Sequence, residues 1–219
     1  MRRLPIAVLL SGTGTNFAAI AAAAAAGTLP VDIRCVLSDR PEARGLERAR
    51  VLGLGAEAIP PRAFPDRAAH DAALIRRIDA AGAELVVLAG YMRIFQPAFI
   101  AHYAGRLLNI HPSLLPAYRG LHTHRRALEA HEPWHGCTVH FVSDDLDGGP
   151  LIAQARVPVR PGDTEERLAQ RVHRREWVLY PRVIGWFAEG RLVEAEGCAV
   201  LDGRRLESPV LIEDADDPD

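Results

Sequence analysis

The sequence contains no lysine and very little cysteine. All 26 of its basic residues are arginine, which excludes chemistry that needs a lysine amine, such as Schiff-base formation. Cys35, Cys137 and Cys198 are scattered and odd in number. Such a pattern is typical of a reducing compartment, and it does not indicate a disulfide framework or a cysteine metal site.

Strong charge imbalance and long apolar runs are also missing. A formal net charge of -2 gives no reason to expect nucleic acid or a membrane surface as a partner. No apolar run approaches the ~20 residues that span a bilayer. The first apolar run, residues 4–10, contains Pro5 and ends in a glycine turn, so we interpret it as a strand rather than a signal peptide. We therefore predict a cytoplasmic protein.

What is present is a regular alternation of strand-like and helix-like segments. It predicts an α/β fold that is Rossmann-like, with a mostly parallel central sheet and helices on both faces. The run Glu-Leu-Val-Val-Leu-Ala at 84–89 is typical of a strand buried on both sides. The predicted strands of this part are residues 6–10, 31–37, 56–59, 84–89 and 107–110. The first predicted helix follows Asn16 and ends near Gly27, and the others are residues 44–52, 67–80 and 97–103.

The pattern changes after Gly120. A helix is expected at 123–130, and the strand-like segments 137–142 and 151–157 flank an Asp-Gly-Gly turn, which predicts an antiparallel hairpin contribution to the C-terminal part. A long helix is expected from Asp163 to about residue 187, with Glu166 completing a capping box. We assign residues 1–190 to one main domain. Residues 191–219 are then a small C-terminal appendix with an acidic tail, 213–219, that is expected to be disordered.

An amide, an imidazole and a carboxylate are the candidate catalytic groups. Asn109 and His111 are two residues apart in a predicted strand, so both side chains leave the same face near its end. Open α/β sheets bind ligands at such ends. Asp147 precedes a glycine turn. Together the three groups can polarise a carbonyl and move a proton. In the alternative interpretation, the histidine is an ordinary loop residue and the asparagine only satisfies backbone.

Three further segments are candidate binding sites. The turn Ser-Gly-Thr-Gly-Thr-Asn at 11–16 lacks the third glycine of the dinucleotide fingerprint and the Gly-Lys-Ser/Thr ending of a P-loop. It suits a single phosphate monoester or is a plain tight turn. Glu176 falls on the apolar stripe of the long helix, so its charge is either paired with an arginine or used by a ligand. In the segment 90–95, Met92, Ile94 and Phe95 can line an apolar slot beside Arg93, or can be core.

The histidines between residues 122 and 140 invite a metal interpretation, but no suitably spaced cysteine or carboxylate accompanies them. We expect no metal, and we expect His122, His124, His131 and His135 to be exposed. His140 is the exception, because its place in a predicted strand allows it to support Asp147.

The motifs also carry a family resemblance. Asn-Ile-His-Pro-Ser-Leu-Leu-Pro at 109–116, followed by Leu-Asp-Gly-Gly-Pro at 146–150, resembles the 10-formyltetrahydrofolate-dependent formyltransferase family. The similarity runs from about residue 6 to about residue 191. It implies that 10-formyltetrahydrofolate is the formyl-donor co-substrate and that the acceptor is the amine of 5-phosphoribosyl-glycinamide, in purine biosynthesis.

The resemblance also implies roles for individual residues. Asn109, His111 and Asp147 are expected to be catalytic, with Asp147 favouring the charged form of His111. The expected ligands of the acceptor are Gly14, Thr15 and Asn16 for its phosphate and Glu176 for its ribose, and those of the folate are Arg67, Met92, Arg93, Ile94, Phe95, Asn109 and Asp144.

Other members of this family are the alternatives. Methionyl-tRNA formyltransferase and formyltetrahydrofolate hydrolase carry additional domains, for which we expect no room in this chain. A folate-binding module without turnover is an alternative of another class, and the presence of all three catalytic groups argues against it. We expect small-molecule substrates as the partners and a monomer or homodimer.

Overall fold

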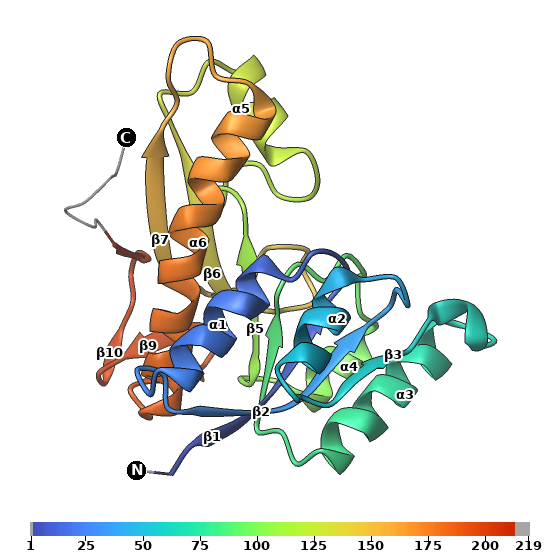
Figure 1. Cartoon of the computed structure of the whole chain (residues 1–219). Coiled ribbons are helices and arrows are strands. Elements are labelled where there is room, and N and C mark those ends of the chain that lie inside the picture. Colours follow the sequence, from blue (N-terminus) through green and yellow to red (C-terminus); the bar gives the residue numbers. More distant parts are fainter. Residues whose placement is uncertain (1, 213–219) are drawn as a thin grey trace.

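The computed structural model describes residues 2–212 (Figure 1). Its centre is an eight-stranded sheet with the strand order β11-β7-β6-β5-β4-β1-β2-β3. The strands of this sheet are β1 (Leu4–Leu10), β2 (Val31–Ser38), β3 (Ala56–Ala58), β4 (Leu85–Leu88), β5 (Leu107–His111), β6 (Trp134–Phe141), β7 (Leu151–Pro158) and β11 (Val210–Leu211). The pairs from β3 across to β5 are parallel, whereas β6 is antiparallel to both β5 and β7. The predicted fold class is thereby confirmed.

Helices cover both faces of the sheet. They are α1 (Thr15–Ala25), α2 (Arg44–Val51), α3 (Arg67–Ala80), α4 (Pro97–His102), α5 (Thr123–Glu129) and α6 (Glu165–Ala188), with a 3-10 turn, η1 (Pro61–Ala63). One buried cluster joins α1, α2 and α6 to one face, and a second joins α3 and α4 to the other. Because β1 and β4 are covered on both faces, their sequences are apolar almost throughout, as helix-flanked parallel strands require.

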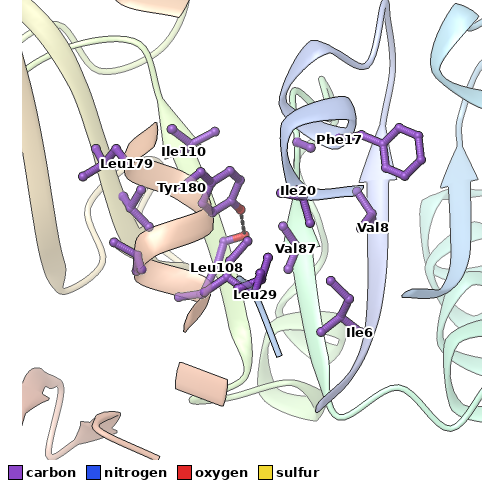
Figure 2. Close-up of a cluster of buried hydrophobic side chains, with 14 of the residues drawn as sticks. Ile6, Val8, Phe17, Ile20, Leu29, Val87, Leu108, Ile110, Leu179 and Tyr180 are labelled. Carbon is purple, nitrogen blue, oxygen red and sulfur yellow. Dashed lines mark hydrogen bonds between the residues drawn. The ribbon is translucent and has the colours of Figure 1, made fainter. Parts of the chain in front are cut away.

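Tyr180, in α6, ties this helix to two strands. Its ring is fully buried, and its hydroxyl lies 3.0 Å from the carbonyl oxygens of both Leu88 and Leu108. Figure 2 shows the ring between the helix and the sheet, with Leu179 beside it and Val87 of β4 across from it. A buried hydroxyl needs such a partner, because an unpaired one costs about 1–3 kcal/mol. The contact fixes α6 against the end of β4 and the first half of β5.

The strand order reverses between β1 and β4. From β1 the chain builds outward to β2 and β3, and from β4 it builds in the opposite direction to β5. The carboxyl ends of β1, β4 and β5 therefore meet at a topological switch point, where open α/β sheets leave room for a ligand. The segments that follow these ends are the glycine turn, the segment from Gly90 and the loop after His111.

The start of α6 differs from the prediction by one residue. Thr164, and not Asp163, is the N-cap, and its hydroxyl accepts the N–H of Arg167. The predicted capping box from Asp163 to Glu166 is wrong because the Asp163 carboxylate is already engaged: it accepts the N–H of Arg160 and two hydrogen bonds from Arg171.

The segment after α6 adds strands to two sheets. Strands β8 (Leu192–Ala195), β9 (Cys198–Leu201) and β10 (Arg204–Arg205) form a small antiparallel sheet, and Leu192 packs against the main core. Strand β11 then joins the main sheet beside β7. The predicted disorder of 213–219 concerns residues outside the described part. Within residues 2–212, the helices are too short or too polar to span a bilayer.

Candidate active site

Asn109 and His111 lie at the carboxyl end of β5, as predicted, and the structure brings Asp147 to them. His111 is 6% exposed, and its Nδ1 lies 3.4 Å from Oδ2 of Asp147. The same carboxylate oxygen accepts the N–H of Gly120 at 2.9 Å. These contacts place a negative charge behind the imidazole while the strand end keeps Asn109 on the same face. The three predicted catalytic groups therefore form one constellation.

The backbone of Asp147 is in the left-handed region, with φ of 49°. Asp and Asn adopt this conformation more readily than other side chains with a Cβ. Gly149 is required two residues later, because a Cβ there would lie 2.0 Å from the carbonyl oxygen of Phe141. The turn is thus pressed against the end of β6, and this contact holds Asp147 over β5.

His140 orients the amide of Asn109. It faces Asn109 across the β5–β6 ladder and is 2% exposed, and burial lowers its pKa to about 4, so it is neutral at pH 7. Its Nδ1 donates to the carbonyl of Phe141 at 2.8 Å, which leaves a lone pair on Nε2. The Nδ2 of Asn109 donates to that lone pair at 3.1 Å. One amide hydrogen is thereby fixed and the other remains for a ligand. His140 also lies 3.8 Å from Asp147, where the sequence placed it.

A loop covers the other side of His111. The imidazole Nε2 lies 3.0 Å from the carbonyl oxygen of Tyr118. Tyr118 has φ of 56°, its hydroxyl donates to Glu132 at 2.7 Å, and the guanidinium of Arg126 lies over its ring. Arg119 is paired with Asp145. Residues 113–120 therefore lie closed against the imidazole, which the sequence does not reveal.

The glycine turn presents the start of α1. Gly14 is the N-cap residue with φ of 70°, and a Cβ on it would lie 2.7 Å from Cα of Gly45. Only glycine fits there. It has no side chain to cap the first turn, and that turn has no acidic residue. The first N–H groups of α1 are consequently oriented to bind an anion, with the helix dipole adding to the attraction.

Asn16 and Glu176, predicted separately, meet in the structure. Nδ2 of Asn16 donates to Oε2 of Glu176 at 2.8 Å, although the residues are 160 positions apart. Glu176 is 4% exposed, and burial raises its pKa, whereas the Asn16 amide and the imidazoles of His173 and His111 act in the opposite direction. The Oδ1 atom of Asn16 is buried, and no partner for it occurs among the described residues. These groups connect the anion-binding turn to the neighbourhood of His111.

The segment 90–96 is only partly arranged as predicted. Met92 and Ile94 are 59% and 58% exposed, as a binding surface requires, but Phe95 is 6% exposed. Its ring is stacked between Tyr91 and Phe99, so it belongs to the core. Arg67 donates to the carbonyl of Ile94 at 2.7 Å and so braces the segment.

Other expectations about polar residues can also be compared with the structure. Asp144 is exposed near the constellation, and its neighbour Asp145 forms the ion pair with Arg119. The expectation of exposed histidines is wrong for His135, which is 1% exposed, and for His124, which is half-buried. Nδ1 of His124 lies 3.0 Å from Nε2 of His135, and burial lowers both pKa values to about 4. In the described part of the chain, no three His, Cys, Asp or Glu side chains are grouped to hold a metal ion.

Comparison with known proteins decides the family. The family described as formyl transferase matches residues 4–184. The chain belongs to this family. It is 53% identical over 201 residues to a phosphoribosylglycinamide formyltransferase from Escherichia coli K12, covering 92% of this chain and 95% of the relative. A protein of the same name from Haemophilus influenzae is 44% identical over equal shares. The solved structure of a Coxiella burnetii phosphoribosylglycinamide formyltransferase is 48% identical, with a TM-score of 0.93 over 97% of this chain and all of that chain.

Three buried polar residues beside the candidate site were not predicted from the motifs. Ser11, Asp39 and Asp71 are buried polar groups around the segment 90–96. Ser11 and Asp39 stand at the ends of apolar strands, and such positions meet at a switch point, so this signal was available in the sequence. Asp71 lies inside α3, where no local pattern distinguishes it from a solvated helix residue.

Proposed function

We propose that this protein is a phosphoribosylglycinamide formyltransferase of de novo purine biosynthesis. It transfers the formyl group of 10-formyltetrahydrofolate to the amine of 5-phosphoribosyl-glycinamide. The observation that carries the proposal is the joining of two sites: the Asn109, His111 and Asp147 constellation lies in electrostatic range of Glu176, which bonds to the anion-binding turn. The names of the relatives support the same reaction.

The acceptor is held by the first turn of α1 and by Glu176. Backbone N–H groups from Gly14 to Asn16 bind its phosphate, and charge-assisted bonds of this kind contribute about 1.5–3 kcal/mol each. A carboxylate accepts hydrogen bonds from neighbouring hydroxyls, so Glu176 binds the ribose. The buried Oδ1 of Asn16 can accept a hydrogen bond from this substrate. These contacts direct the amine toward His111.

The folate co-substrate supplies an electrophilic formyl carbon when bound. The chain offers groups of the kind that a flat heterocycle needs: exposed apolar side chains at Met92 and Ile94, and the exposed carboxylate of Asp144. Arg67 is suited to the acidic tail, because its guanidinium lies at the edge of the same segment. The residues therefore fit a folate.

The catalytic groups act on charge and protons. Asn109 donates its free amide hydrogen to the formyl oxygen, on which negative charge develops as the amine attacks. His111 stabilises the same oxygen and, with Asp147, moves the proton from the attacking amine toward the leaving nitrogen. Because Nε2 of His111 is bonded to the Tyr118 carbonyl, the loop 113–120 must release it first.

The remaining features of the proposal follow from the same assignment. Residues 1–190 form the catalytic domain and residues 191–219 an appendix. The protein acts in the cytoplasm on small molecules, as a monomer or homodimer. It needs no metal, since the amine attacks the formyl carbon directly.

The decisive experiment offers the purified protein a choice of acceptors. It is mixed with 10-formyltetrahydrofolate and either ribosylglycinamide phosphate, the same compound without its phosphate, or buffer, and the folate product is followed spectroscopically. Turnover should need the amine, and loss of the phosphate should lower kcat/KM at least about tenfold, the equivalent of one charge-assisted hydrogen bond. Equal rates with and without the phosphate would show that the turn does not bind it. An equal rate in buffer alone would show that the protein hydrolyses 10-formyltetrahydrofolate.

A further inference from the structure

Ser11 stands where β1 ends and the glycine turn begins, and it contacts the segment that follows β4. Its backbone N–H donates to the carbonyl of Gly90 at 3.0 Å. Its side-chain hydroxyl accepts the N–H of Met92 at 2.8 Å and donates to Oδ1 of Asp39 at 2.5 Å. Ser11 is 3% exposed and Asp39 is 8% exposed. One residue thus joins the start of the acceptor turn to the start of the folate segment.

The carboxylate of Asp39 fixes the direction of the hydroxyl. A serine hydroxyl has a single hydrogen, and here it points to Asp39, so its lone pairs face the N–H of Met92. Asp39 follows β2, and the guanidinium of Arg40 lies 4.0 Å from its other oxygen. The Ser38 hydroxyl accepts the backbone N–H of Arg40. The Ser11–Asp39 pair is therefore a charge-assisted contact between neighbouring strand ends in a nearly dry environment.

The far end of the folate segment is held by other groups. The N–H of Gln96 donates to Oδ2 of Asp71 at 2.7 Å, and Asp71 is 6% exposed. Between the two ends, the rings of Tyr91 and Phe95 are stacked 5.2 Å apart. The segment 90–96 is consequently held at its far end. Ser11 determines the position of its near end relative to β1 through its bonds to Gly90 and Met92.

We propose that Ser11 and Asp39 are positioning residues that align the folate with the acceptor amine. This inference rests on the proposed function, because it needs the folate on segment 90–96 and the acceptor phosphate on turn 11–16. Neither side chain touches the reacting atoms. They act through Met92: if its N–H loses the hydroxyl, the exposed surface of the segment moves relative to the turn that begins at Ser11. A misplacement of about 1 Å between reacting groups costs on the order of a hundredfold in rate.

The test is the Ser11→Ala variant, with Asp39→Asn as a second variant and Ser38→Ala as the control. Ser11→Ala removes the acceptor of the Met92 N–H but leaves its own backbone in place. Asp39→Asn keeps an oxygen for the Ser11 hydroxyl and loses only the charge. Ser38 is also a buried strand-end serine, but its hydroxyl bonds only within its own turn.

The measurements are kcat, KM for each substrate, thermal midpoint, and affinity for a folate analogue that cannot transfer a formyl group. For Ser11→Ala we expect KM for folate to rise about tenfold and kcat to fall about tenfold. Each change corresponds to the free energy of about one hydrogen bond. The acceptor KM should change by less than about threefold, since the phosphate ligands are backbone N–H groups. Asp39→Asn should show the same split with a smaller loss, and Ser38→Ala should be kinetically like the parent protein.

Several outcomes overturn the inference while leaving the proposed function intact. One is a fall in thermal midpoint for Ser11→Ala with unchanged kinetic constants per folded molecule, because the pair is then only structural. Another is an equal kinetic loss in Ser38→Ala. If Ser11→Ala does not fold, Asp39→Asn is the deciding variant. Folate KM and kcat equal to those of the parent protein in that variant would show that the Ser11–Asp39 pair does not position the folate. An inactive parent protein with both substrates would instead reject the proposed function.

Discussion

Replacing Asp147 by asparagine removes one negative charge from behind His111 with little change of shape. The asparagine amide keeps an oxygen for the N–H of Gly120, and it tolerates the left-handed backbone at this position as aspartate does. Its NH2 group takes the place of Oδ1, which lies 3.8 Å from Nε2 of His140 and makes no close contact with it. The fold should therefore persist, and the loss should fall on catalysis.

The size of that loss follows from the separation of the charges. Oδ2 of Asp147 lies 3.4 Å from Nδ1 of His111. Two unit charges at this distance attract by about 5 kcal/mol in a medium of effective dielectric constant about 20. Acid–base groups typically contribute at least about a hundredfold in rate, or roughly 2.7 kcal/mol, so the contact is large enough to account for such a loss. We expect kcat of Asp147→Asn to fall by about a hundredfold or more.

The assay is single-turnover and steady-state kinetics with both substrates, next to a thermal melt. Asp145→Asn is the matched control, because it removes a charge from the same loop but pairs with the exposed Arg119 and not with the imidazole. Its kcat should stay within about threefold of the parent value, as expected for an exposed ion pair. The reasoning is refuted if both variants lose equal activity, or if Asp147→Asn melts early but turns over normally per folded molecule.

Three further predictions concern other groups of the site. Asn109→Ala should lower kcat by a factor that corresponds to about 3 kcal/mol of transition-state stabilisation. The double variant with His111→Asn should be little slower than the slower single variant, because both residues act on one transition state. Additive losses in kcat would assign the two residues to separate steps. Burial raises the pKa of Glu176 in the folded protein. The protonated carboxyl therefore stabilises the fold at pH values below the pKa of the unfolded state, and this stabilisation is lost as the pH rises through the pKa of the folded state. The thermal midpoint of Glu176→Gln should therefore be higher than that of the parent protein at pH 8 and equal to it near pH 4. Burial lowers the pKa of His135 to about 4, so the fold should lose up to about 3 kcal/mol as pH falls from 6.5 toward 4; His135→Gln should flatten this decline in melts across that range, and an unchanged decline would contradict the assignment.

The parallel part of the fold was predictable because its signals are local and agree with one another. The run at β4 is apolar on both faces, glycines follow β1, and helix-length segments lie between the strands. The start of α6 was misplaced because Asp163 and Thr164 are both good caps, and the choice depends on Arg171, eight residues away. Such a choice is made by a side-chain contact, which the local pattern does not contain.

The site divides in the same way. Asn109, His111, Asp147 and Glu176 could be predicted as candidates because each breaks an apolar pattern or stands at a strand end, and the family resemblance suggested their roles. The Tyr118 carbonyl could not be found, because it is a backbone atom placed by a loop whose shape depends on Glu132 and Arg126. The burial of Phe95 could not be predicted for a related reason: an aromatic side chain suits a ligand slot and a stacked core equally well.

The double contact of Tyr180 also bears on the order in which the chain can become native. Its hydroxyl bonds to carbonyls 92 and 72 positions earlier in the sequence. During synthesis, β4 and β5 therefore leave the ribosome well before the hydroxyl that bonds to both strands exists. Long-range contacts form late, because the loop-closure cost comes first. A nascent chain that stops before α6 should therefore remain protease-sensitive even though strands β1 to β5 are present. Formation of α6 is thus the step that completes the native structure of the parallel part of the sheet.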